Sequence, residues 1–103
     1  MSASDSRVEI TLRNFLLMCA GDPRIGTSHI ALYIGLMHLW NQNGQQNPIM
    51  AFNREIMRTI KIASTSTFTR LISDLKCGGY IEYEPSFYKN QPSAITLCTH
   101  NPR

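Results

Sequence analysis

Apolar side chains recur at helical spacing near the start of the chain. The first such stripe follows the spacing i, i+4, i+7, i+8, i+11 and consists of Val8, Leu12, Phe15, Leu16 and Cys19. Asp5 or Ser6 is placed to cap this helix, because short polar side chains accept hydrogen bonds from the first free backbone N–H groups. Residues 21–26 contain two glycines and a proline, so we expect the helix to end before them.

A second predicted helix is apolar on nearly all sides. It is expected to begin with Thr27 or Ser28 as its cap and to run to about Asn43. One face carries Ile30, Tyr33, Ile34, Met37 and Trp40, and another carries Leu32, Leu36 and Leu39. A helix that is apolar all round must be buried all round, and in a small domain one face can meet the core. The surplus leucine face therefore predicts a contact with the first helix or with a second subunit, and we expect a homodimer formed through the N-terminal helices, residues 5–45.

The second half begins with the pattern of a helix-turn-helix, residues 53–78. It follows a short apolar extended piece, residues 49–52. Asn53 is placed to cap a brief helix, and residues 61–63 form a connector of the length expected for this motif. Ser64 is expected to cap a third helix, which two glycines end by supplying the backbone conformation of a helix terminus.

Apolar and polar residues alternate with a period of two after these glycines. Residues 80–98 contain two such runs, which predict two antiparallel strands. A turn-rich connector, residues 86–92, separates the runs and offers Lys89, Asn90 and Gln91 at its tip. Two strands after a helix-turn-helix form a wing. The predicted fold class is therefore α+β and mainly α, a winged helix-turn-helix with two N-terminal helices and a C-terminal two-stranded wing.

The outer face of the third helix carries short polar side chains and two cations. It consists of Thr65, Ser66, Thr69, Arg70, Ser73 and Lys76. A helix that enters the major groove of DNA needs short polar side chains near its N-terminus, because they let the backbone approach base edges and phosphates. Serine and threonine are otherwise poor helix formers, and a purely structural surface would more often carry Glu, Lys or Gln. The alternative interpretation is an extended capping motif on a solvated face.

Size and charge restrict the class of protein further. The 103 residues predict one domain, and 43% hydrophobic against 17% charged residues are enough to bury a core. The net charge is +3, and the whole excess lies in residues 53–103, where a polyanionic partner would therefore bind. The longest apolar stretch, residues 30–40, is about half the roughly 20 residues that a membrane span needs. The first residues lack the pattern of a secretory signal, so we expect a cytoplasmic protein with no membrane partner.

No constellation of catalytic residues can be assembled from the sequence. A carboxylate pair, a phosphate-binding loop and a nucleophile–base pair are all missing. Cys19, Cys77 and Cys98 are far apart and lack a Cys-x-x-Cys spacing, which favours reduced thiols over a zinc site. His29 and His38 have no catalytic partner at a suitable spacing and are expected on the surface or in packing. We expect neither an enzyme nor a metal, a cofactor or a small-molecule ligand.

Residues 56–81 follow the pattern Ile-x-x-x-Ile-x-Ile-x-Ser-x-x-Thr-Phe-x-Arg-Leu-Ile-x-x-Leu-x-x-x-Gly-Tyr-Ile. This pattern resembles bacterial winged helix-turn-helix DNA-binding domains. The preceding helix ends Leu-Met-His-Leu-Trp-Asn-Gln-Asn and is followed by a loop with Asn-Pro, which is similar to DnaD-like primosomal domains and to small winged-helix proteins of bacterial mobile elements. The resemblance covers about residues 28–98. It implies that residues 64–77 form the recognition helix and residues 86–93 the wing.

The pattern and the resemblance together predict a protein that binds double-stranded DNA and regulates transcription or a mobile element. The expected DNA-contacting residues are Arg54, Arg58, Lys61, Ser64, Thr65, Ser66, Thr69, Arg70, Ser73, Lys89, Asn90 and Gln91. Among these, the resemblance implies that Thr65, Ser66, Thr69 and Arg70 face DNA. Arg70 is expected at a guanine or a phosphate, and Lys89 at the adjacent minor groove or phosphate.

The alternative prediction is a winged helix that binds proteins in a replication or conjugation assembly. Its binding face would be the surplus apolar face formed by Leu32, Leu36 and Leu39. Cations clustered on one side of the domain would favour DNA as the partner, and dispersed cations would favour protein.

Overall fold

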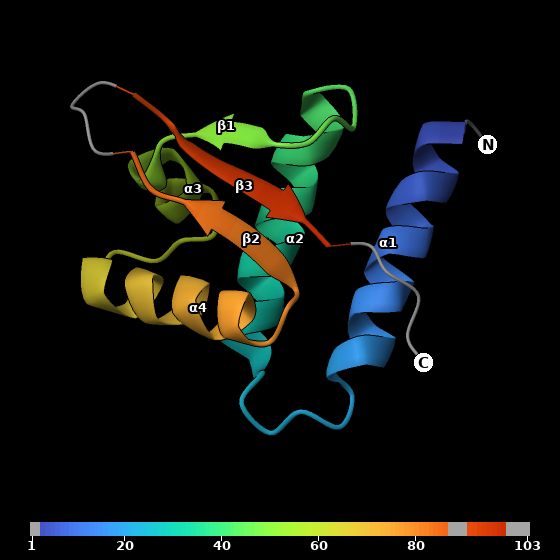
Figure 1. Ribbon diagram of the computed structural model, residues 1–103, viewed down its shortest axis with the longest axis horizontal. Helices are drawn as coiled ribbons and strands as arrows, with labels where there is room; N and C mark the ends of the chain where they lie inside the picture. The colour runs from blue at the N-terminus through green and yellow to red at the C-terminus, as the bar shows by residue number, and fades with distance from the viewer. Residues whose placement is uncertain (1–2, 87–90, 99–103) are drawn as a thin grey trace.

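The computed structural model describes residues 3–86 and 91–98. These residues form four helices and a three-stranded antiparallel sheet, a small α+β fold that is mainly helical (Figure 1). In chain order the elements are α1 (Ala3–Cys19), α2 (Thr27–Gln42), β1 (Ile49–Ala51), α3 (Asn53–Thr59), α4 (Thr65–Cys77), β2 (Ile81–Glu84) and β3 (Ser93–Leu97). None of the described helices is long and apolar enough to cross a membrane.

The predicted caps of the first two helices are wrong. Asp5 and Ser6 both lie within α1. Residues 27–28 lie within α2, which is preceded by Gly26 as the N-cap residue. The backbone N–H of Gly26 donates to Nδ1 of His29 at 3.0 Å, so the third residue of the helix reaches back to the N-cap residue.

The predicted boundaries of α4 are confirmed. Ser64 caps the helix, because its Oγ accepts a hydrogen bond from the backbone N–H of Thr67 at 3.3 Å. At the other end, Gly79 has a φ of +80°, a conformation that costs glycine little. The buried side of α4 consists of Phe68, Leu71, Ile72 and Leu75.

The sheet has one strand more than the predicted two-stranded wing. Its order is β1-β3-β2, and β1 pairs with β3 so that Ile49 lies opposite Ile95. The strand β1 comes from the extended piece before α3, in which Ile49 and Ala51 point inward and Met50 points outward. Three residues show too little alternation to be recognised as a strand, and the pairing that makes them one comes from residues more than forty positions away.

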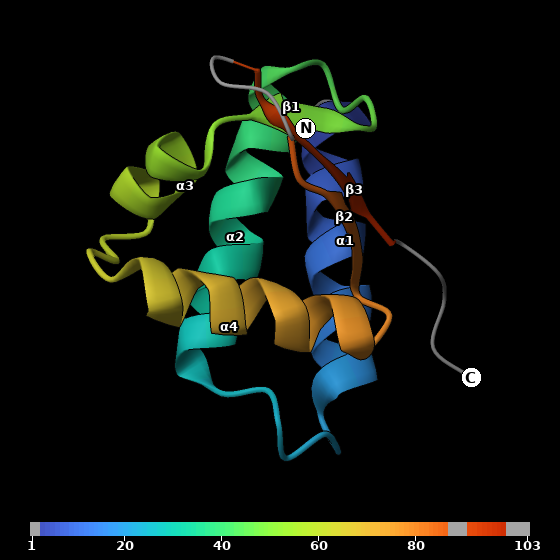
Figure 2. The ribbon, with the colours of Figure 1, turned by 60° about the vertical axis from the view of Figure 1, so that its left-hand side comes forward.

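The helix α2 lies at the centre of the fold and is covered by α1, α3, α4 and β1 (Figures 1 and 2). On the α1 side, the ring of Tyr33 stacks on Phe15 with 3.8 Å between ring centroids. The predicted surplus face is not available to a partner, since Leu32 and Leu36 are 0% exposed and Leu39 is half-buried. The sequence could not show that this chain supplies enough elements of its own to surround α2. Leu32 and Leu36 are therefore not the exposed apolar face on which the expectation of a dimer or a protein complex was based.

Candidate nucleic-acid interface

The outer face of α4 is open to solvent along its length. Figure 2 shows the helix crossing in front of α2. The buried side chains of α4 belong to the hydrophobic core. All six predicted contact residues of this segment are exposed, namely Ser64, Thr65, Ser66, Thr69, Arg70 and Ser73. Lys76, one turn beyond Ser73, is exposed as well. The sequence pattern therefore identified the exposed side of α4 correctly.

The hydroxyl groups on this face divide into two kinds. Ser64 and Ser66 bond to each other, with 3.1 Å between their Oγ atoms, while Ser64 also caps the helix. These two residues have the structural role that the capping interpretation gave to the whole run. Thr65, Thr69 and Ser73 have no hydrogen-bond partner for their hydroxyls within residues 3–86 and 91–98, and are free to bind a ligand.

Arg70 lies on the same exposed face, one turn after Ser66. Its guanidinium makes no ion pair or hydrogen bond with any described residue. A guanidinium offers five N–H donors in a planar fork, which can bind a phosphate or the O6 and N7 atoms of guanine through two hydrogen bonds. Arg70 is thus the strongest unpaired donor on α4.

Three further cations extend this surface along α3 and the turn that leads to α4. Arg58, in the last turn of α3, and Lys61, in the connector, are both exposed and lie close in the chain to the start of α4. Arg54 is exposed at the other end of α3, where its guanidinium lies 4.9 Å from the centroid of the Phe52 ring. This stacking holds the charge near β1 rather than leaving it free in solvent.

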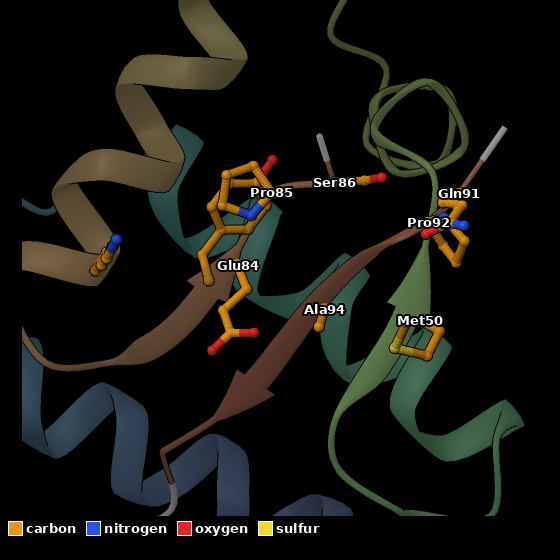
Figure 3. Close-up of a pocket in the computed structure, with 9 residues that line it drawn as sticks. Met50, Glu84, Pro85, Ser86, Gln91, Pro92 and Ala94 are labelled. Carbon is orange, nitrogen blue, oxygen red and sulfur yellow. The ribbon is translucent and has the colours of Figure 1, made fainter. Parts of the chain in front are cut away.

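The strand ends near residues 86 and 91 form the second part of the candidate interface. Lys89 and Asn90 lie outside the described residues, and Gln91 is exposed. Figure 3 shows Gln91 and Pro92 beside Met50. All three line a hollow of about 530 Å³ on the outer face of the sheet.

The outer face of β2 is acidic. Glu82 and Glu84 are both exposed there, and Glu84 points over the hollow, as Figure 3 shows. Two carboxylates repel phosphates, so this face is unsuited to a DNA backbone. Among the predicted contact residues that the structure describes, the exposed cations lie on α3, the α3–α4 turn and α4.

Asn53 connects α3 to both strands of the hairpin. Its Oδ1 accepts a hydrogen bond from the Tyr83 hydroxyl at 3.1 Å and another from the Ser93 hydroxyl at 3.3 Å. The prediction that Asn53 caps α3 is wrong, since the N-cap residue is Phe52 and no side chain caps this helix. The bonding partners of Asn53 lie 30 and 40 residues away in the chain, so the sequence offered no signal for this role. These two hydrogen bonds fix the position of the β2–β3 hairpin relative to α3.

His29 connects the start of α2 to α4. Its Nδ1 accepts the Gly26 N–H, so in the neutral ring Nε2 carries the hydrogen and donates to Asp74 Oδ2 at 2.8 Å. Asp74 lies on α4, on the side facing α2, and this bond orients its carboxylate away from the open face. The histidine was expected only to pack or to face solvent, because its partner lies 45 residues away.

The loop between α1 and α2 is attached to Tyr80, the residue directly before β2. The Tyr80 hydroxyl donates to Asp22 Oδ2 at 2.8 Å, and Arg24 pairs with the same carboxylate at 3.2 Å. These bonds, chiefly that from the Arg24 side chain, lower the pKa of Asp22 from 3.8 to about 2. Burial, followed by the bond to Asp22, raises the pKa of Tyr80 to about 12.

Other ligand chemistry has little support in the described part of the chain. No group of three or more His, Cys, Asp or Glu residues there could hold a metal ion. Cys19, Cys77 and Cys98 are unpaired thiols, and burial raises the pKa of Cys19 and Cys98.

Comparisons with known proteins identify no relative. No protein-family model, no curated protein and no solved structure matches the chain. The geometry of the interface is therefore the basis for assigning a function.

Proposed function

We propose that this chain is a winged-helix protein that binds double-stranded DNA and serves as a regulator of transcription or of a mobile element. The observation that carries the proposal is the outer face of α4, which presents unpaired hydroxyls and one unpaired guanidinium along a helix with a well-packed inner side. In the proposed complex, α4 enters the major groove of the DNA.

The order of the elements supports this assignment. From α2 onward the chain runs helix, strand, helix, helix, strand, strand, and the last strand pairs between the other two. This order is the one expected of a winged helix-turn-helix and supports the proposal that α3 and α4 are the two helices of the motif and the β2–β3 hairpin its wing.

Each part of the interface has a distinct role in the proposed complex. Arg70 contacts a guanine or a phosphate, while Thr65 and Thr69 bind phosphates or base edges. Arg54, Arg58 and Lys61 bind the DNA backbone on the flank of the groove. Glu82 and Glu84 keep the sheet face away from the phosphates, so that the wing approaches DNA with its tip.

The protein-binding alternative was based on an exposed face formed by Leu32, Leu36 and Leu39, and Leu32 and Leu36 are buried within the domain.

Binding of a fluorescently labelled duplex, followed by anisotropy over a range of salt concentrations, tests the proposal. With about four to six phosphates neutralised per chain, the logarithm of the binding constant should fall with the logarithm of salt concentration with a slope of about −4 to −5. Arg70→Ala should weaken binding. Arg7→Gln is the control, because Arg7 is an exposed cation that belongs to α1, near the Trp40 ring, and not to α3, α4 or their turn. No affinity at low salt, or no dependence on salt, would refute DNA binding.

A further inference from the structure

Arg70 and Asp74 lie one helical turn apart on α4. Four residues is the spacing at which an arginine and a carboxylate on one helix surface form an ion pair. Of the residues three or four positions from Asp74, Arg70 is the only cation. In the structure, however, Arg70 makes no ion pair or hydrogen bond with any described residue, and the Asp74 carboxylate bonds to His29 on α2 instead. Asp74 thus has two candidate partners, and it is found with the one outside its own helix.

The histidine that holds Asp74 is itself fixed at both ring nitrogens. Its Nδ1 accepts the backbone N–H of Gly26 at 3.0 Å, and its Nε2 bonds to Oδ2 of Asp74 at 2.8 Å. The side chain of His29 is 11% exposed, whereas that of Asp74 is 35% exposed. Because both nitrogens are bonded, the ring keeps one orientation, and it holds the more exposed carboxylate on the α2 side of α4.

An ion pair between Asp74 and Arg70 would oppose DNA binding in two ways. The carboxylate would occupy N–H donors of the guanidinium that otherwise bind a phosphate or a guanine. It would also place a negative charge next to the group that meets the phosphates, and like charges at short range repel. The position of the Asp74 carboxylate therefore decides whether Arg70 is free to bind DNA.

We propose that His29 is a positioning residue for the DNA-binding surface, because by holding Asp74 on the α2 side of α4 it keeps the guanidinium of Arg70 unpaired. His29 is buried and acts through Asp74 without touching DNA. Without His29, Asp74 competes with DNA for Arg70. The competition between His29 and Arg70 for Asp74 stands on the geometry of α2 and α4, and only its effect on DNA rests on the proposed function.

Anisotropy of a labelled duplex with a set of single and double variants tests this role. His29→Ala should weaken binding about fivefold, because the released carboxylate pairs with Arg70 and repels phosphates. Adding Asp74→Asn to His29→Ala should restore the wild-type affinity, since the amide carries no charge. Loss of packing at His29 could not be repaired in this way. His29→Gln is the conservative control, because its amide offers an acceptor for Gly26 and a donor for Asp74, and it should bind like the wild type.

A second measurement needs no DNA. The ¹⁵N relaxation of the Nε–Hε group of Arg70 reports how mobile its guanidinium is. Arg70 should be mobile in the wild type, more ordered in His29→Ala, and mobile again when Asp74→Asn is added. Thermal unfolding confirms that each variant is folded at the temperature of both measurements.

The proposal would be overturned if His29→Ala left both the affinity and the mobility of Arg70 unchanged. It would also be overturned if Asp74→Asn failed to restore binding, or if His29→Gln bound as weakly as His29→Ala. A wild type without affinity for DNA contradicts the proposed function, and the relaxation of Arg70 then decides the competition for Asp74 on its own. A wild type that binds DNA while the variants fail these expectations contradicts only the role of His29.

Discussion

Replacing Gly35 by alanine tests how closely α2 and α3 approach each other. Gly35 is buried in the middle of α2, next to Ile60 at the end of α3. A methyl group added at Gly35 would overlap with Cγ2 of Ile60, at far less than the roughly 3.5–4.0 Å at which carbon atoms attract each other most. Ile60 also begins the turn that leads to α4, so a shift of its backbone that relieves the overlap would move the candidate interface.

Two opposing effects set the expected magnitude. Alanine in place of glycine in the interior of a helix stabilises it by about 1 kcal/mol. Overpacking a core contact costs about 1–3 kcal/mol. We therefore expect Gly35→Ala to lower the free energy of unfolding by about 1 kcal/mol. In an Ile60→Ala background the overlap is gone, so the same substitution should raise the free energy of unfolding by about 1 kcal/mol.

Urea denaturation followed by fluorescence gives both values, because Trp40 is the only tryptophan in the chain and is buried in the core. The difference between the two backgrounds is the coupling energy of Gly35 and Ile60, and we expect about 2 kcal/mol. If Gly35→Ala stabilised the protein equally in both backgrounds, the two helices would not approach here and the argument would fail.

Three further predictions concern individual hydrogen-bonded side chains, namely Asp22, the pair Asn53 and Tyr83, and Ser64. The lowered pKa of Asp22 means that its carboxylate stabilises the fold above its ordinary pKa of 3.8 and that this contribution is lost as the pH falls to about 2. Asp22→Asn should therefore flatten the fall of the thermal midpoint over that pH range, and an unchanged profile would contradict the account. Asn53→Ala and Tyr83→Phe should each lower the free energy of unfolding, measured by urea denaturation, by about 1 kcal/mol. The double variant should lose less than the sum of the two, and full additivity would mean that the two side chains do not interact. Ser64→Ala should cost about 1 kcal/mol through the lost cap and Ser64→Asp should restore it, as thermal unfolding would show.

Local signals in the sequence predicted much of the second half of the fold. The boundaries of α4 follow from the cap at Ser64 and the glycines after Cys77, both of which act over only a few residues. The exposed face of α4 follows from the spacing of its apolar stripe. The two strands of the hairpin were likewise apparent from alternation over four and five residues.

Contacts between distant parts of the chain were not predictable in this way. Asn53 had the sequence position of a helix cap, but its Oδ1 accepts hydrogen bonds from the hydroxyls of Tyr83 and Ser93 and does not cap α3. His29 had no visible partner until α4 brought Asp74 to within 2.8 Å. Leu32 and its neighbours looked superfluous because the sequence does not show how many elements surround a helix. In each case the deciding contact depends on the folded arrangement, and local propensity carries no information about it.

The central claim is that the outer face of α4 reads double-stranded DNA through Arg70. Selection of bound sequences from a pool of random duplexes, carried out in parallel with the wild type, Arg70→Ala and the control Arg7→Gln, tests it most directly. We predict that the wild type and the control enrich the same motif, and that Arg70→Ala loses preference at one position of that motif. A wild type that enriches no motif, or an Arg70→Ala variant that enriches the complete motif, would contradict the claim.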